Sequence, residues 1–280
     1  MASLDARLLR LHSQQFADAG AGLLCVDYAG HPCELAEIQE IAEEHDLFLI
    51  DDACHALGAE YGGKRLGTFA DMTIFSFHPV KPITTGEGGA VVTDNSELAE
   101  RLRLLRSHGI DRNIPSPKDQ GWAYDMVMLG RNYRLTDIQA ALGGSQLRRL
   151  EGFLERRNRI AELYRQQLGG IPQVTLPGVK PGVYHGWHLF TVLIEEGIRD
   201  AVYADLKAQG VGAQVHYIPI YRFSYYRTHF PSLAPGAFPV TEEIFGKILT
   251  LPLYPAMTDA DVAFCADALR HSVRKGRRTA

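Results

Sequence analysis

Short apolar runs separated by a helical stretch dominate the first third of the chain and restrict its possible folds. The runs lie at residues 23–26, 47–50, 72–75 and 90–92. Between the first two runs, Leu35, Ile38 and Ala42 recur at the spacing of one helix face. Buried parallel strands joined by crossover helices produce this pattern, so the sequence predicts a βαβ unit within an α/β fold.

Two capping boxes mark helix starts in the middle of the chain, at residues 94–97 and 136–139. The first predicts a helix over 98–107. An apolar stripe follows the second box and continues beyond residue 150. We therefore expect a long or kinked helix there, bridging two domains.

The pattern changes after about residue 170. Apolar and polar residues then predict a strand over 189–194, a helix around Val202 and Leu206, and a second strand over 213–217. Thr258 is a suitable cap for a last helix. This half of the chain is typical of a small α+β domain.

The composition describes an ordinary globular protein of 280 residues with 46% hydrophobic residues. A formal net charge of −4 provides no general attraction to nucleic acid or to acidic membranes. The four cysteines show no CxxC spacing, the opening does not resemble a signal peptide, and no apolar run approaches the roughly 20 residues of a membrane span. We expect a cytoplasmic protein with reduced thiols and no metal site.

A lysine that follows the third apolar run is the strongest candidate for a catalytic residue. Lys81 stands in the turn-rich segment 76–89, and Asp52 closes the preceding predicted strand. Open α/β sheets bind ligands at the carboxyl ends of their strands. A lysine amine there can form a Schiff base with the aldehyde of pyridoxal 5'-phosphate (PLP), while a buried carboxylate keeps the pyridine nitrogen protonated. The pair therefore predicts a PLP site with Lys81 as its catalytic residue.

Neighbouring polar residues extend this predicted site. Asp51 competes with Asp52 for the nitrogen contact, because either carboxylate would be partly desolvated at the end of an apolar strand. His55 is expected beside the cofactor ring, although a lone histidine in such a place is more often a hydrogen-bonded core residue. Ser76 can donate its hydroxyl to the cofactor phosphate, whereas the glycines of 86–89 are equally consistent with a plain turn.

Longer segments around these residues carry a resemblance. They are residues 51–58, 76–89, 130–141, 216–219 and 251–255. In this order they resemble the nucleotide-sugar aminotransferases of the DegT/DnrJ/EryC1/StrS family. Within the family, residues 77–89 and 214–217 are most similar to the transaminases that make UDP-4-amino-4,6-dideoxy-N-acetyl-L-altrosamine for pseudaminic acid.

The resemblance implies a fold, a cofactor and roles for individual residues. The fold is that of PLP-dependent transferases of fold type I, like aspartate aminotransferase, in a homodimer with shared active sites. Lys81 matches the Schiff-base lysine, Asp52 the partner of the pyridine nitrogen, and Ser76 a phosphate ligand. Asn132 matches an asparagine that reaches the cofactor phosphate of the neighbouring subunit. His216 and Tyr217 match a segment near the sugar substrate.

The activity implied is transamination of a 4-keto nucleotide sugar, of the UDP-4-keto-6-deoxy amino sugar type, with glutamate as the expected amino donor. Related sugar dehydratases have histidine in place of this lysine, so Lys81 favours transamination. Family members usually carry an amino-terminal segment with a Gly-Thr phosphate loop, which residues 1–22 do not resemble. We therefore interpret 1–22 as an atypical leader, 23–150 as a partial large PLP-binding domain and 151–280 as a small C-terminal domain. The alternative is a catalytically impaired remnant that acts as a binding or partner subunit.

Overall fold

The computed structural model describes residues 22–113 and 121–279, which form two compact units. The N-terminal unit contains the described residues up to 151 together with 182–184. The C-terminal unit contains 152–181 and the residues from 185 onward. The leader predicted at 1–22 lies, except for Gly22, outside the described residues.

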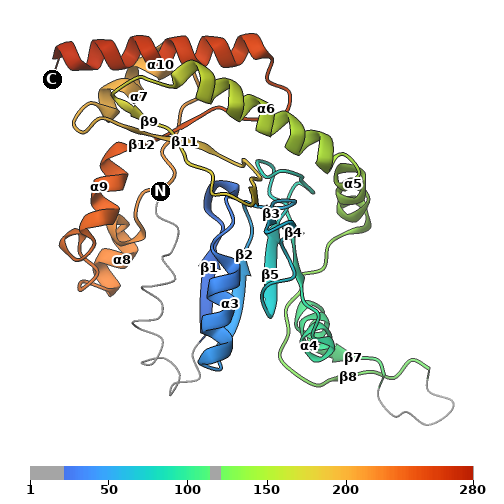
Figure 1. Cartoon of the computed structure of the whole chain (residues 1–280). Helices are drawn as coiled ribbons and strands as arrows, with labels where there is room; N and C mark the ends of the chain where they lie inside the picture. The colour runs from blue at the N-terminus through green and yellow to red at the C-terminus, as the bar shows by residue number, and fades with distance from the viewer. Residues whose placement is uncertain (1–21, 114–120, 280) are drawn as a thin grey trace. The chain divides into compact units, whose positions relative to one another are not determined.

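A four-stranded sheet in the order β1-β2-β5-β6 organises the N-terminal unit. Its strands are β1 (Gly22–Val26), β2 (Phe48–Asp52), β5 (Met72–Ser76) and β6 (Gly89–Val92). The first three strands of this order run parallel, and α3 (Leu35–Glu44) connects β1 to β2 (Figure 1). The apolar stripe of α3 is buried, which confirms the predicted βαβ unit.

The expectation of four buried parallel strands is wrong in two respects. β6 pairs with β5 in the antiparallel direction, because residues 77–88 form a compact loop instead of a crossover helix. One face of the sheet is also open among the described residues, where Leu24, Val26 and Phe48 are 56%, 47% and 36% exposed. A continuous apolar run indicates burial but specifies neither the strand direction nor what covers each face.

The other elements of this unit are short. They are η1 (Tyr28–Gly30), β3 (Glu60–Tyr61), β4 (Lys64–Arg65), α4 (Ser96–Arg106), β7 (Ile110–Asp111), β8 (Asp125–Met126), α5 (Asp137–Leu147) and β10 (Val183–Tyr184). β3 lies between β10 and β4, and β7 pairs with β8. α4 begins two residues before the predicted range of 98–107, and its cap is Asn95 and not the predicted Asp94, because Asn95 accepts the N–H of Leu98, at 3.1 Å.

The second capping box is present as predicted, with Thr136 and Gln139 bonding reciprocally at the start of α5. The expected long or kinked helix is interrupted at residues 148–149. α5 ends at Leu147, and α6 (Leu150–Leu168) begins immediately after the interruption.

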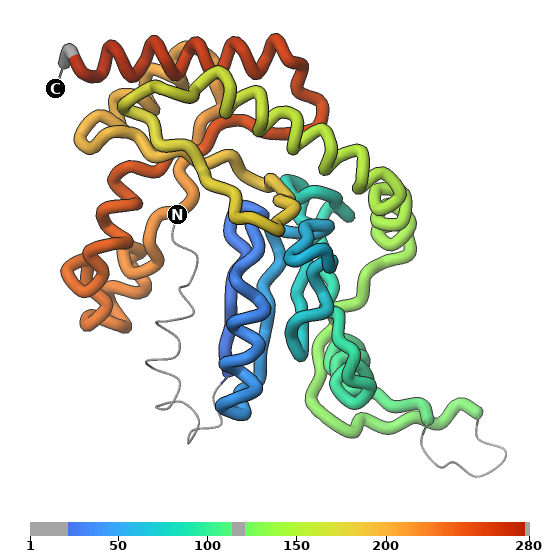
Figure 2. Tube along the Cα trace, viewed as in Figure 1, coloured from blue at the N-terminus to red at the C-terminus, as the bar shows by residue number. Residues whose placement is uncertain are grey.

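The C-terminal unit is an α+β structure built on a three-stranded antiparallel sheet in the order β12-β11-β9. Its elements after α6 are β9 (Val174–Thr175), β11 (Phe190–Ile194), α7 (Arg199–Ala208), η2 (Ile220–Arg222), α8 (Ser224–His229), η3 (Pro235–Ala237), α9 (Pro239–Lys247), β12 (Ile248–Leu251) and α10 (Asp259–Thr279). Figure 2 shows α10 as the long last helix, and it packs against α7. The predicted strand over 213–217 is wrong, because only Gln214 forms a bridge, to Thr250.

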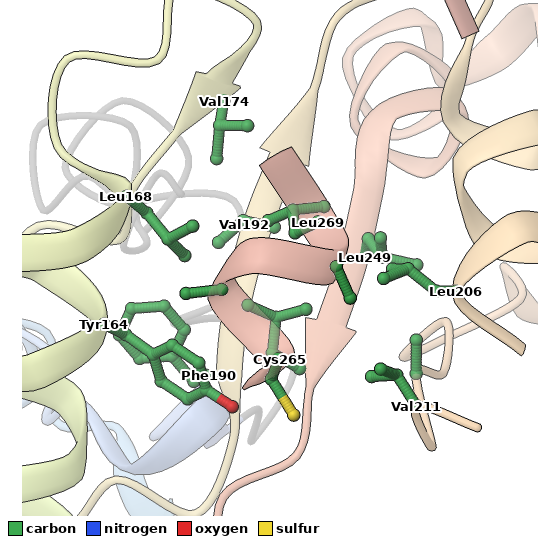
Figure 3. Packing of buried hydrophobic residues seen from close by; sticks show 14 of the residues in the cluster. Tyr164, Leu168, Val174, Phe190, Val192, Leu206, Val211, Leu249, Cys265 and Leu269 are labelled. Carbon is green, nitrogen blue, oxygen red and sulfur yellow. The ribbon is translucent and has the colours of Figure 1, made fainter. Parts of the chain in front are cut away.

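The core of the C-terminal unit lies between its helices and β11 and β12. Tyr164 of α6 and Phe190 of β11 are fully buried, with ring centroids 4.9 Å apart (Figure 3). Each such large apolar side chain contributes roughly 1.5–3 kcal/mol on burial. Thr258 caps α10 as predicted, since its hydroxyl accepts the N–H of Asp261 at 3.1 Å. No helix within the described ranges has the length and apolar character needed to cross a membrane.

Candidate active site

The two adjacent carboxylates at the end of β2 face opposite sides of the sheet. In the strand register, Asp51 lies beside Cys25 and Thr73, whereas Asp52 lies beside Val26 and Ile74. Asp51 is fully buried on the side of α3, and Asp52 is half-buried on the open side. The alternation of a strand therefore separates the two candidates for the pyridine-nitrogen contact.

Lys81 lies in the loop between β5 and β6, which is closed by main-chain and side-chain hydrogen bonds. Phe77 N–H donates to the Gly88 carbonyl at 2.9 Å, and Thr85 N–H donates to the Phe77 carbonyl at 3.0 Å. Lys81 N–H itself donates to the His78 carbonyl at 3.0 Å. The loop backbone therefore holds the lysine just beyond the carboxyl end of β5.

The Lys81 amine is half-buried and interacts electrostatically with Asp52 and Cys54. Burial lowers the pKa of this amine below its ordinary value, and the two neighbours partly oppose that effect. A lowered pKa increases the fraction of neutral amine near pH 7, and only the neutral amine is a nucleophile. Lys81 and Asp52 thus belong to one cluster, as the sequence predicts.

Asp52 is anchored by its own turn, because its Oδ1 accepts the N–H of Cys54 at 3.1 Å. Burial and a hydrogen bond to Asp52 raise the pKa of the Cys54 thiol to about 12, so that the thiol remains protonated at neutral pH. Cys54 is a site residue that the sequence reasoning missed. Its only signal was its position two residues after Asp52.

Ser76 is the last residue of β5 and shares the open side of the sheet with Asp52, because strand positions two apart face the same way. Its Oγ accepts the N–H of His78 at 3.4 Å.

Gly88, in the same loop, adopts φ +151°, and a Cβ there would lie 2.5 Å from Thr85 Oγ1 and 2.8 Å from Leu135 Cδ2. Close packing therefore requires glycine at position 88, which favours the turn interpretation for the glycines of 86–89.

His55 is held from the loop after β1. Ala29 N–H donates to His55 Nδ1 at 3.2 Å, and the Tyr28 ring lies 5.9 Å from the His55 ring, centroid to centroid. Because Nδ1 accepts this bond, the neutral imidazole carries its proton on Nε2. Ala29, buried with φ +62°, was not identified from the sequence.

The remaining predicted site residues make contacts elsewhere. Asn132 is exposed and bridges to Ser107 beside the end of α4. His216 and Tyr217 belong to the C-terminal unit, where His216 Nδ1 lies 2.9 Å from Thr250 Oγ1 and Tyr217 is 54% exposed. Within the described parts of the chain, no group of three His, Cys, Asp or Glu side chains is arranged to hold a metal ion.

The chemistry of this cluster fits PLP. Three suitable groups lie at the carboxyl ends of β2 and β5, namely the Lys81 amine with its lowered pKa, the Asp52 carboxylate and the Ser76 hydroxyl. Asp52 and Ser76 lie on the same side of the sheet. These groups match the aldehyde, the pyridinium and the phosphate of the cofactor, respectively. Lys81, Asp52 and Ser76 are therefore the residues able to hold it.

Comparison with known sequences agrees with this chemistry. The sequence profile of the DegT/DnrJ/EryC1/StrS aminotransferase family matches residues 14–270. An uncharacterised protein of Methanocaldococcus jannaschii is 42% identical over 261 residues, which cover 91% of this chain and 67% of that protein. The UDP-4-amino-4,6-dideoxy-N-acetyl-beta-L-altrosamine transaminase of Campylobacter jejuni is 38% identical over 278 residues, covering 98% of this chain and 70% of the enzyme.

Solved structures of sugar aminotransferases also resemble the chain. PseC of Helicobacter pylori, an aminotransferase involved in the biosynthesis of pseudoaminic acid, matches with a TM-score of 0.83 and 33% identity over 91% of this chain and 67% of PseC. A Streptococcus pneumoniae protein described as a candidate sugar aminotransferase, in its PLP form, matches with a TM-score of 0.87 and 26% identity over 97% of this chain and 72% of its own. The α/β fold of type I and the cofactor predicted from the sequence are thereby confirmed.

Proposed function

Because the chain belongs to the PLP-dependent DegT/DnrJ/EryC1/StrS aminotransferase family, we propose that it transfers an amino group to a 4-keto nucleotide sugar of the UDP-4-keto-6-deoxy amino sugar type. Glutamate is the proposed amino donor. Two relatives support this substrate class, the altrosamine transaminase of Campylobacter jejuni and PseC of Helicobacter pylori.

One observation carries the proposal, namely the clustering of Lys81 with Asp52. The amine lies in the β5–β6 loop, and the carboxylate lies at the end of the neighbouring strand β2. Binding modules that only recognise a nucleotide sugar have no need of a partly desolvated amine beside a carboxylate. Catalysis with PLP uses the amine for covalent attachment and the carboxylate as partner of the pyridine nitrogen.

The residues of the chain act on protons at defined atoms. PLP, when bound, supplies the electron sink that stabilises negative charge at the reacting carbon. Lys81 Nζ would hold the cofactor, and the neutral amine, once released, would take up and return a proton at the substrate carbon. Its lowered pKa favours this role near neutral pH, because an ammonium group cannot accept a proton.

The neighbouring side chains orient the cofactor and set its charge. Asp52 would accept a hydrogen bond from the protonated pyridine nitrogen and keep the proton there. Ser76 would donate its hydroxyl to the phosphate. His55, whose Nδ1 accepts the Ala29 N–H, would lie beside the ring.

We propose a homodimer in which Asn132 contributes to the neighbouring subunit's phosphate site. Asn132 belongs to a stretch of the chain with strongly exposed large apolar side chains, including Leu129 at 81% and Ile138 at 83%. Exposed apolar side chains of this size are typical of interaction sites. His216 and Tyr217 are proposed to contact the sugar.

We also propose a cytoplasmic location, in keeping with the four free cysteines. Residues 23–150 are assigned to a partial large PLP-binding domain and 151–280 to a small C-terminal domain.

Borohydride trapping tests the attachment of the cofactor. Protein incubated with PLP and reduced should yield a pyridoxyl-modified peptide containing Lys81, together with loss of the visible absorbance band. Lys81→Ala should give neither result, whereas Lys64→Ala, which removes an exposed lysine of β4, should behave as the wild type. Modification of other lysines with Lys81 unmodified would contradict the proposal.

The substrate class is tested in a single turnover. The protein in its pyridoxamine-phosphate form should transfer its amine to a UDP-4-keto-6-deoxy amino sugar, regenerate the PLP spectrum, and return to the starting form with glutamate. A panel of 4-keto sugars with other nucleotides serves as the control. Cofactor binding without turnover of any keto sugar would refute the aminotransferase assignment.

A further inference from the structure

Two carboxylic acids lie buried on the face of the sheet opposite Lys81. Asp27 immediately follows β1, and Asp51 is the penultimate residue of β2. Because Cys25 pairs with Asp51 in the register, Asp27, two residues beyond Cys25, faces the same side. Both carboxyl groups are fully buried.

Each carboxyl group has one oxygen that is satisfied and one that is not. Asp27 Oδ1 accepts the N–H of Cys33 at 2.7 Å, and Asp51 Oδ1 lies 3.7 Å from Cys25 Sγ. Both Oδ2 atoms are buried without a donor in the described parts of the chain. The Asp27 carboxyl nevertheless interacts with that of Asp51 and opposes the rise in its pKa, as do Cys25 and the Thr73 hydroxyl. Two buried carboxylate oxygens cannot satisfy each other unless a proton lies between them.

We propose that Asp27 and Asp51 share one proton between their Oδ2 atoms, and that this acid pair is a positioning element for Asp52. Each member of the acid pair is connected directly to Asp52. Asp27 N–H donates to the Asp52 carbonyl at 3.1 Å, and Asp51 precedes Asp52 in the chain. The role of Asp52 rests on the proposed function, whereas the shared proton is a property of the protein without cofactor.

The surroundings of the pair favour one retained proton. Desolvation, followed by the charge of Asp51, raises the pKa of Asp27 to about 10. Desolvation also raises the pKa of Asp51 to about 6, although the hydrogen bond from Asp27 opposes the shift. Asp51 is therefore the acceptor and Asp27 the donor, and the pair carries one negative charge at neutral pH.

Three groups face the pair from the elements packed against it, namely Cys25 of β1, Cys33 before α3 and Thr73 of β5. Asp52 of β2 faces the opposite side and acts on Asp51 through its charge alone. α3 contributes apolar side chains to the same buried cluster. Within the described residues, no cation faces either carboxyl group, so a proton is the available counter-charge.

Substitution by asparagine provides the first test, in protein without PLP. Asp27→Asn keeps an acceptor for Cys33 N–H and places an amide donor toward Asp51, so the variant should fold. In D2O near neutral pD, the infrared carbonyl stretch of one un-ionised carboxylic acid should be present in the wild type and absent in Asp27→Asn. Asp94→Asn, at an exposed position, is the matched control and should retain the band.

Unfolding against pH provides a second measurement. Asp27 retains its proton in the folded state, so this contribution to stability is complete below about pH 4 and is lost as pH rises toward about 10. The urea midpoint should therefore fall between pH 5 and pH 9 more in the wild type than in Asp27→Asn. Asp27→Leu, which leaves Cys33 N–H unpaired, should be destabilised at every pH.

The positioning role is tested in the PLP form. Asp51→Asn removes the negative charge beside Asp52 and should lower the midpoint of the cofactor's spectral titration by about one pH unit. An unchanged midpoint would refute the positioning role.

Absence of the acid band in the wild type, or its persistence in both Asp27→Asn and Asp51→Asn, would refute the shared proton. If no variant binds PLP, the proposed function fails, and the infrared and unfolding results still decide the shared proton.

Discussion

Two successive aspartates of β2 acquire different chemistry because a strand turns alternate side chains to opposite faces. Asp51 faces the buried side, where it meets Asp27 and Cys25, while Asp52 faces the side of the Lys81 amine. The same residue type at neighbouring positions therefore serves two purposes. The proposed site uses Asp52 as the half-buried charge on the open side of the sheet and Asp51 as its fully buried neighbour.

Asp52→Asn is expected to lower kcat/KM for amine transfer by about 100-fold or more, the loss expected for one charge-assisted hydrogen bond. The asparagine cannot hold the pyridine nitrogen in its protonated form. Borohydride should still trap PLP on Lys81, since that attachment needs only the amine. Steady-state rates and peptide mass spectrometry measure the two effects, with Asp94→Asn as control. An unchanged rate in Asp52→Asn would assign the nitrogen contact to another residue.

The sequence predicted Lys81, Asp52 and Ser76 because strand ends and turn residues are local signals. It left Asp51 open as a competitor, because the side on which a residue faces depends on pairing with β1 and β5. Asp27 escaped notice for the same reason, since a single polar residue after a strand carries no motif. Only the pairing register of β1 and β2 shows that Asp27 lies on the same side of the sheet as Asp51.

Among the secondary-structure elements, α5 makes a close contact with the lysine loop. A Cβ at Gly143 would lie 2.9 Å from Thr85 Cγ2, and Thr85 is buried with its hydroxyl bonded to the Glu87 carbonyl at 2.7 Å. Gln139 of the same helix donates to the Glu87 carbonyl at 3.0 Å. α5 thus supports the loop that carries Lys81.

Gly143→Ala is therefore expected to destabilise the protein by about 1–2 kcal/mol, since Thr85 cannot yield without losing its hydrogen bond. The adjacent Gly144→Ala is the matched control. Its Cβ would meet only the end of Arg148, at 3.9 Å, so the gain in helix propensity should stabilise the protein by about 0.5–1 kcal/mol. Urea unfolding measures both. Equal effects of the two substitutions would show that α5 does not press on the loop.

Elements with strong periodicity were predictable, and those defined by long-range pairing were not. α3 and the capped starts of α5 and α10 follow directly from residue spacing. β12 was missed, since Ile248–Leu251 follows α9 without a turn signal and becomes a strand by pairing with β11. The antiparallel direction of β6 could have been predicted, because residues 77–88 carry no helical pattern and parallel pairing requires a crossover.

At the scale of the whole molecule, many exposed apolar side chains belong to residues 122–138 of the N-terminal unit. Trp122 and Tyr133 are 73% and 75% exposed, and Leu129 and Ile138 more than 80%. Side chains of this size are typical of surfaces that a partner covers. A second copy of the chain is the partner we propose.

Mixing of subunits tests that assembly. Lys81→Ala and Asn132→Ala should each be nearly inactive alone, because each removes one part of every shared site. Equal amounts, unfolded and refolded together, should recover about a quarter of the wild-type rate, since half of the dimers are mixed and each has one intact site. No recovery, with dimers present by light scattering, would place Asn132 in its own subunit's site. Monomers throughout would refute the shared site.

Lys81 is anchored by contacts of short range. The strands on either side of its loop are consecutive in the chain, so closing the loop costs little conformational entropy. Bringing Asp52 alongside requires the parallel pairing of β2 with β5, which joins more distant segments and forms more slowly. During folding, the loop that holds the lysine should therefore form before the carboxylate reaches it. Attachment of PLP should become possible with the first event, and amine transfer only with the second.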